Sequence, residues 1–95
     1  MKVVTLCGSM RFSKQMQKIA IALETKHGCC VITPVVDADV PISAEAMAAL
    51  GKAHYRKIDL ADAVYIVNLG GYIGEAVSKE ICYAREHNKE IVYHE

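Results

Sequence analysis

The chain has 95 residues, 53% of them hydrophobic, which suits one domain near the lower size limit for an independent core. Its 11 Lys and Arg residues balance 11 Asp and Glu residues, so no net charge favours a nucleic acid polymer or an anionic membrane as partner. No apolar run approaches the ~20 residues of a membrane-spanning helix, and the first strand leads straight into glycine rather than into a long apolar segment. We therefore expect a cytoplasmic protein without membrane contact.

The first half of the chain predicts a strand, a helix and a second strand. Val3 to Leu6 is a short β-branched run, typical of a fully buried strand, and Cys7-Gly8-Ser9 is expected to end it as a turn. From Ser13 the apolar residues recur at helical spacing, until Gly28 ends the helix just after His27. Cys29 to Thr33 then predicts a second buried strand. The inner stripe of the helix is formed by Phe12, Met16, Ile19, Ala20 and Leu23.

The second half predicts two further helix and strand pairs. Val35 to Pro41 contains two aspartates and ends in proline, which indicates a connecting loop. Ser43 is a suitable N-cap for a helix that runs to about Leu60. Ala63 to Leu69 is the expected third strand, a third helix covers roughly Gly74 to His87, and Glu90 to Tyr93 is the fourth strand.

The order of elements, βαβαβαβ, predicts the fold class. Strands that alternate with helices pair in parallel through right-handed crossovers, with helices on both faces of the sheet. We expect residues 1–95 to form a single flavodoxin- or Rossmann-like three-layer α/β/α domain with four parallel strands in the order 2-1-3-4. In such sheets a ligand binds beyond the carboxyl ends of the strands where the order reverses, here between strands one and three.

A first candidate binding loop follows strand one. Gly8, Ser9 and Arg11 offer backbone N–H groups, a hydroxyl and a guanidinium at the start of a helix, which is typical of an anion site. Cys7, which precedes them at the strand end, is a further candidate binding residue. The alternative is a simple strand-to-helix turn with Ser9 as its cap, and the GxGxxG fingerprint of dinucleotide binding is absent.

A second candidate loop follows strand three. Three glycines lie close together there, and close approach of backbone to a ligand is one reason for glycine, with ordinary turn chemistry as the alternative. The candidate binding residues of this loop are Asn68, Gly70, Gly71, Tyr72 and Gly74.

Helical geometry singles out Glu80. At about 100° per residue, Val77, Ile81 and Ala84 form the buried stripe of the third helix, and Glu80 lies only about 65° from its centre. This carboxylate therefore borders the sheet face close to the expected site. It is either a functional group or a partner for the amides of the glycine loop.

The same projection places His54 on the inward side of the second helix, about 40° from Ile58. His54 can therefore reach the cleft, although a core histidine with a hydrogen-bond partner fits equally well. Ser9 lacks the GxSxG context of a hydrolase nucleophile. We expect no metal and no cofactor, because no close Cys or carboxylate partners accompany the histidines His27, His54, His87 and His94.

The four cysteines show neither CxxC spacing nor the pattern of a secreted disulfide scaffold. The adjacent pair lies within an apolar run. We therefore expect reduced thiols within the core at Cys7, Cys29, Cys30 and Cys82.

Three segments together carry a resemblance to a known family. They are Cys7-Gly8-Ser9-Met10-Arg11-Phe12, Ala61-Asp62-Ala63-Val64-Tyr65-Ile66-Val67 and Ser78-Lys79-Glu80-Ile81-Cys82-Tyr83-Ala84. With these motifs the chain resembles the nucleoside 2-deoxyribosyltransferase superfamily over nearly its whole length, and it is also similar to 2'-deoxynucleoside 5'-phosphate N-hydrolases. The resemblance implies a small-molecule nucleoside or nucleotide substrate and a homodimer or higher homo-oligomer.

The resemblance also implies roles for individual residues. Glu80 would be the nucleophile or the carboxylate that stabilises an oxocarbenium ion, while Gly8, Ser9 and Arg11 would cradle the ribose or its 5'-phosphate. His54 aligns with the second acidic residue of the family, and a histidine can exchange a proton with a leaving base. Three functions remain open: cleavage or transfer at an N-glycosidic bond, binding of a nucleotide in the same cleft without turnover, and, on the small size alone, an interaction domain with a vestigial cleft.

Overall fold

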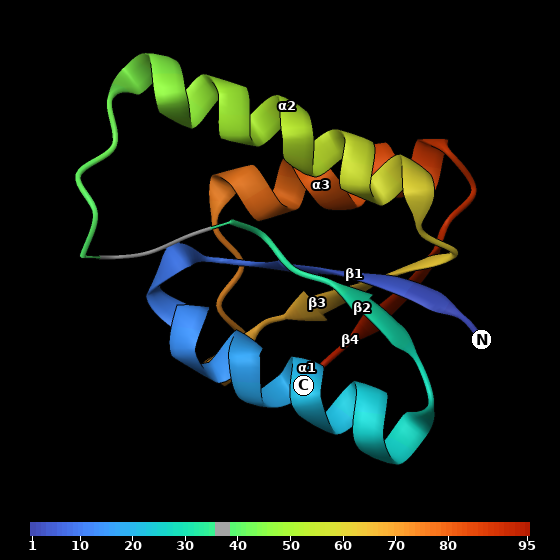
Figure 1. Cartoon of the computed structure of the whole chain (residues 1–95). Helices are drawn as coiled ribbons and strands as arrows, with labels where there is room; N and C mark the ends of the chain where they lie inside the picture. The colour runs from blue at the N-terminus through green and yellow to red at the C-terminus, as the bar shows by residue number, and fades with distance from the viewer. Residues whose placement is uncertain (36–38) are drawn as a thin grey trace.

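The computed structural model describes residues 1–35 and 39–95 and confirms the expected fold class. A four-stranded parallel sheet has the strand order β2-β1-β3-β4, with α1 on one face and both α2 and α3 on the other (Figure 1). This is a small Rossmann-like α/β domain. The elements are β1 (Val3–Gly8), α1 (Ser13–His27), β2 (Cys30–Ile32), α2 (Ala44–Leu60), β3 (Ala63–Val67), α3 (Glu75–Glu86) and β4 (Glu90–Tyr93), with 3-10 turns at Met10–Phe12 and Leu69–Gly71.

The helix ends follow the signals in the sequence. The Oγ of Ser43 accepts a hydrogen bond from the backbone N–H of Ala46 at 3.1 Å and so caps α2, as expected. Gly28 ends α1 with a left-handed φ of 65°, which glycine adopts without strain. Of the loop expected over Val35 to Pro41, residues 36–38 lie outside the described residues. In the part of the chain that is described, no helix has the length and apolar character needed to cross a bilayer.

The lengths of two strands differ from the prediction. β1 runs through Cys7 and Gly8, which pair with Ile66 and Val67 of β3, so the expected turn at Cys7-Gly8-Ser9 starts only at Ser9. β3 in turn ends at Val67 rather than Leu69, because the chain enters the 3-10 turn there. The longer β1 carries Cys7 to the carboxyl edge of the sheet.

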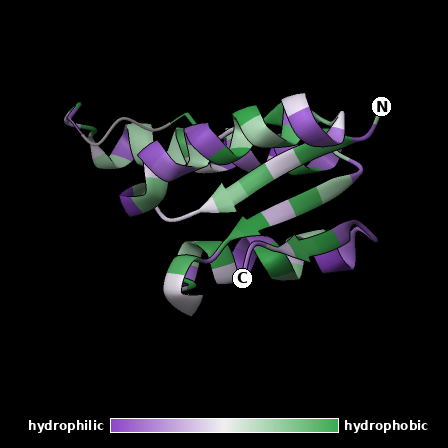
Figure 2. Cartoon of the chain, turned by 90° about the horizontal axis from the view of Figure 1, so that it is seen from below, coloured by the Kyte–Doolittle hydropathy of each residue, from purple (hydrophilic) through white to green (hydrophobic). Residues whose placement is uncertain are grey.

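The core forms on both faces of the sheet, and the inner stripes expected for the first and third helices are confirmed. Leu6 and Val67 pack against Met16 of α1, while Ile58 and Ile81 are buried on the opposite face with Cys7, Val64, Ile66, Val77 and Ala84. Figure 2 shows strands that are mostly hydrophobic between helices in which hydrophilic and hydrophobic residues alternate. This packing fixes which helix residues face the sheet.

Two expectations of burial were wrong. β2 is not a buried strand: Cys30 is exposed and Val31 and Ile32 are half-buried, because β2 pairs on one side only and lies at the sheet edge. Cys82 is also exposed, so of the four cysteines only Cys7 belongs to the core. All four are free thiols.

Candidate functional site

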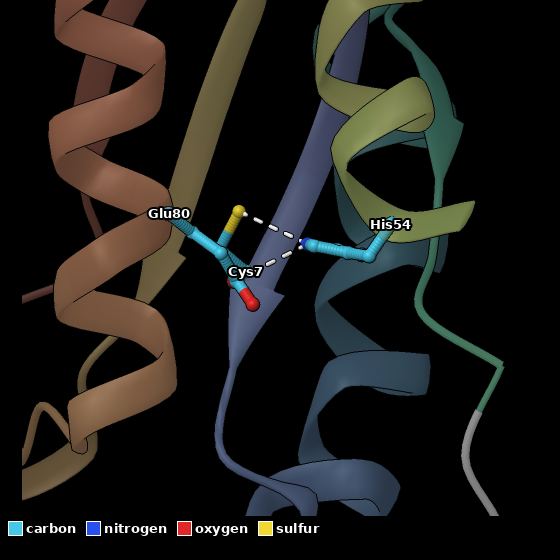
Figure 3. A group of neighbouring side chains, drawn as sticks. All are labelled: Cys7, His54 and Glu80. Carbon is cyan, nitrogen blue, oxygen red and sulfur yellow. Dashed lines mark hydrogen bonds and ion pairs between the residues drawn. The ribbon is translucent and has the colours of Figure 1, made fainter. Parts of the chain in front are cut away.

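Cys7, His54 and Glu80 form a compact cluster between the sheet and the two helices that cover it. Nε2 of His54 lies 3.4 Å from Sγ of Cys7 and 3.3 Å from Oε1 of Glu80. The three side chains come from β1, α2 and α3 and converge on one point (Figure 3). The structure thus brings together the two residues for which we predicted a catalytic role, with a cysteine beside them.

The periodicity of each element explains why these side chains meet. Side chains alternate across a strand, so Leu6 faces α1 and Cys7 faces α2 and α3. His54 lies four residues before the buried Ile58, and Glu80 lies three residues after the buried Val77 and four before the buried Ala84. The inward placement that helical projection predicts for both residues is confirmed.

The electrostatics of the cluster centre on the carboxylate. Burial raises the pKa of the Cys7 thiol, and the negative charge of Glu80 and a hydrogen bond to Glu80 raise this pKa further. The thiol therefore stays protonated and donates to the carboxylate. We assign a proton to Nε2 of His54 because that nitrogen faces Glu80, whereas the buried Nδ1 has no hydrogen-bond partner among the described residues. Glu80 thus accepts two hydrogen bonds.

A cavity of about 530 Å³ opens beside the cluster at the carboxyl edge of the sheet. Its wall includes His54 and Glu80, while Cys7, which is fully buried, lies behind them. The remaining lining residues are Gly8, Ser9, Met10, Pro34, Val35, Ile42, Met47, Leu50, Gly51, Ala53, Lys57, Tyr72, Gly74, Glu75, Ala76 and Val77. Such a volume is in the range of sites for small molecules.

The first predicted binding loop reaches the cavity only in part. Gly8 and Ser9 line it, but the Oγ of Ser9 also accepts the backbone N–H of Arg11 at 3.3 Å and caps the 3-10 turn. That turn separates the loop from α1, so the loop does not open the long helix as expected. The guanidinium carbon of Arg11 lies 4.0 Å from the centroid of the Tyr72 ring, and Tyr72 itself lines the cavity. Arg11 therefore lies next to the cavity wall without being part of it.

Only part of the second predicted loop lines the cavity, and the rest of it contacts Glu95. Tyr72 and Gly74 line the cavity, whereas Asn68, Gly70 and Gly71 do not. The side chain of Asn68 instead makes two hydrogen bonds to the backbone of Glu95, and the N–H of Gly70 donates to the Glu95 carboxylate at 3.0 Å. This half of the loop holds the last residue of the chain.

Two features of the cavity escaped the sequence analysis. Among the residues that the structure describes, Lys57 is the one Lys or Arg that lines it, and an apolar wall is formed by Ile42, Met47 and Leu50. The helical spacing could have found Lys57, because it lies three residues after His54 on the same helix face. Of the apolar wall, Ile42 lies before α2, where the chain gives no periodic signal, whereas Met47 and Leu50 belong to α2 itself.

The glycine of the first loop has a packing role. A Cβ on Gly8 would lie 3.0 Å from Cβ of Val67 and 3.1 Å from Sδ of Met16. The close approach of β3 and α1 favours glycine there, and this preference is independent of any ligand.

The reason for expecting no metal site was also wrong. His54 has no Cys or carboxylate neighbour in the sequence, but folding places Cys7 and Glu80 so that one ligand atom of each residue lies within 4.8 Å of the others. The three residues have the types that a metal site needs, but they lie so far apart in the sequence that no local spacing predicts their contact.

The cavity lies where topology predicts a ligand site. Gly8 ends β1 beside the end of β3, which is where the strand order reverses. A comparison of the chain with models of known protein families gives no match, and a search among curated proteins finds no significant relative.

Proposed function

We propose that the protein cleaves the N-glycosidic bond of a nucleoside or nucleotide, or transfers its ribosyl or deoxyribosyl group, at Glu80. The observation that supports this most is the position of the Glu80 carboxylate. It lies in the wall of a cavity of about 530 Å³, with 15% of its side-chain surface exposed, and two hydrogen-bond donors hold it. A carboxylate held in this way is suited to a cation that forms next to it.

The chemistry needs one carboxylate at the anomeric carbon. When the bond between C1' and the base nitrogen breaks, its electron pair leaves with the base and positive charge develops at C1'. Glu80 either stabilises this charge or forms a bond to C1', which water or a second base then displaces. Water as acceptor gives hydrolysis, and a second base gives transfer.

Cys7 and His54 support the carboxylate in different ways. Cys7 is a positioning residue, because it is fully buried and donates to Glu80 without facing the cavity. His54 also holds Glu80, but it lines the cavity and can pass a proton to the leaving base. The proposed catalytic pair is therefore Glu80 and His54.

The character of the lining suggests how a substrate would lie. The apolar wall of Ile42, Met47 and Leu50 suits a nucleobase, and the hydroxyl of Ser9 suits the sugar. Two nearby cations could bind a 5'-phosphate: Lys57, which lines the cavity, and Arg11, which lies beside Tyr72. The small size of the chain and its family resemblance also lead us to propose a cytoplasmic homodimer or higher homo-oligomer.

The second candidate function is a module that binds a nucleotide without turnover. Its support is that His54 and Cys7 both contact Glu80, and that a histidine stands where the resemblance implies an acidic residue. The same cavity and the same ligand class serve both functions.

One experiment separates the two functions. The protein is incubated with a panel of nucleosides, deoxynucleosides and their 5'-monophosphates, and free base is measured by chromatography alongside the melting temperature. We expect free base from at least one compound. Thermal stabilisation by a nucleotide without base release would contradict the enzyme and support the binding module.

A further inference from the structure

The cluster of Cys7, His54 and Glu80 has the dimensions of a tetrahedral metal site. Zinc bonds of about 2.0 Å to nitrogen, about 2.1 Å to oxygen and about 2.3 Å to sulfur place tetrahedral ligands about 3.3 to 3.6 Å apart. The observed separations are 3.3 Å between His54 Nε2 and Glu80 Oε1 and 3.4 Å between Nε2 and Cys7 Sγ. Two of the three separations therefore match the spacing that zinc would impose, and the third, between Cys7 Sγ and the Glu80 carboxylate, is within 4.8 Å.

We propose that Cys7 Sγ, His54 Nε2 and a carboxylate oxygen of Glu80 bind one Zn²⁺ ion. Three protein ligands leave the fourth tetrahedral position open, as in zinc sites that exchange a ligand. Because His54 and Glu80 line the cavity, that position and the entry route for the ion lie on the cavity side. The site goes beyond the proposed function, which requires no metal.

The donor set selects zinc over magnesium and calcium. A sulfur, an imidazole nitrogen and a carboxylate oxygen suit Zn²⁺, whereas Mg²⁺ and Ca²⁺ require mainly oxygen ligands. As the Zn–S bond forms, the Cys7 thiol proton leaves to solvent through the cavity. The proton on Nε2 of His54 is lost and Nδ1 takes one up, so that the imidazole stays neutral and the Nε2 lone pair binds the ion. The thiolate and the Glu80 carboxylate then balance the two positive charges of the ion, so no net charge is buried.

The surroundings of His54 limit the affinity. In most zinc sites the second ring nitrogen of a histidine ligand donates to a carboxylate or carbonyl, and loss of that partner weakens binding by about 10- to 100-fold. Nδ1 of His54 has no such partner in the described part of the chain. Zinc binding is therefore expected to be reversible, and a bound ion would remove Glu80 from its proposed role at C1'.

Direct measurement of bound metal tests the proposal without any assay of activity. Metal-free protein, kept reduced with a phosphine, is dialysed against Zn²⁺ and the bound metal is counted by elemental mass spectrometry. We expect one Zn²⁺ per chain, no binding of Mg²⁺, and, with Co²⁺ as a probe, the absorption of tetrahedral cobalt bound to a thiolate. Cys7→Ser, His54→Ala and Glu80→Gln should each weaken binding at least about 10-fold.

Cys82→Ser and the double variant Cys29→Ser/Cys30→Ser are the matched controls, because these cysteines lie outside the cluster. Both should bind zinc like the wild type. Circular dichroism shows which variants are folded. If Cys7→Ser or His54→Ala unfolds the protein, Glu80→Gln still tests the site, because glutamine keeps the shape of the side chain. The proposal is overturned if the folded wild type binds no stoichiometric zinc, or if binding survives Glu80→Gln and is lost in the Cys29/Cys30 variant.

Discussion

Nε2 of His54 lies 3.3 Å from Oε1 of Glu80, and this contact joins α2 to α3 beside Cys7 of β1. Only 9% of the His54 side chain and 15% of the Glu80 side chain are exposed, so neither group is well solvated. A buried polar group that loses its partner destabilises the fold. The pair therefore links the stability of the domain to the geometry of the site.

Replacement of His54 tests this link. His54→Ala removes one of two donors to Glu80 and leaves a space in the core, so we expect the free energy of unfolding to fall by about 1–3 kcal/mol. Denaturation in urea measures the change. His27→Ala, at the exposed end of α1, is the control and should stay within about 0.5 kcal/mol of the wild type. Equal effects of the two substitutions would mean that the buried contact contributes nothing.

The cysteines should differ sharply in reactivity. The pKa of Cys7 is raised above that of a free thiol by burial and by Glu80, so its thiolate fraction is lower at every pH. Cys30 and Cys82 are exposed. With iodoacetamide at mildly alkaline pH, mass spectrometry should find Cys30 and Cys82 alkylated while Cys7 is unmodified until the protein is denatured. Modification of Cys7 as fast as that of Cys82 in the folded protein would refute this.

Two glycines provide opposite tests of packing. Gly8→Ala places a Cβ 3.0 Å from that of Val67 and 3.1 Å from Sδ of Met16, so we expect a loss of about 1–3 kcal/mol in unfolding free energy. A Cβ on Gly51, within α2, meets no atom within 4 Å. Gly51→Ala should therefore stabilise the protein by about 0.5–1 kcal/mol. Thermal unfolding measures the change in stability of both variants. Changes of the same sign would contradict the packing that we describe around Gly8 and Gly51.

Tyr83 should make stability depend on pH in the alkaline range. Its hydroxyl donates to a carboxylate oxygen of Asp59 at 2.6 Å, and this hydrogen bond raises the pKa of Tyr83 above its ordinary value of 10.0. A raised pKa means that the stabilisation is complete below the unfolded pKa and is lost as pH rises through the folded one. The stability difference between wild type and Tyr83→Phe should thus be constant near neutral pH and shrink above about pH 10. A difference that grows with pH would contradict the assignment.

Much of the fold could be read from the sequence because its helices are amphipathic and its strands short and apolar. Spacing alone identified the buried faces around Ile58 and Ile81, and so the inward positions of His54 and Glu80. The exposure of Cys30 could not be read in this way, since an edge strand and a central strand have similar local patterns. The packing of the whole chain decides which strand lies at the sheet edge and which is buried between neighbours.

The site was foreseen less completely than the fold. Gly70 and Arg11 were predicted to bind the ligand because of their residue types. Instead, Gly70 donates a hydrogen bond to the Glu95 carboxylate, and Arg11 lies over the ring of Tyr72, outside the cavity wall. The contact of Cys7 with His54 joins residues 47 positions apart, and no local pattern encodes such a distance. It arises from the extra length of β1 and the position of α2 above it.

Base release by Glu80→Gln tests the proposed function most directly. The substitution keeps the shape of the side chain but removes the charge that would stabilise or trap C1', while Glu86→Gln makes the same change on the exposed side of α3, away from the cavity. We expect Glu80→Gln to lower kcat by at least about 100-fold on the preferred substrate, and Glu86→Gln to leave it unchanged. Wild-type kcat in a folded Glu80→Gln variant would show that the Glu80 carboxylate does not carry the reaction.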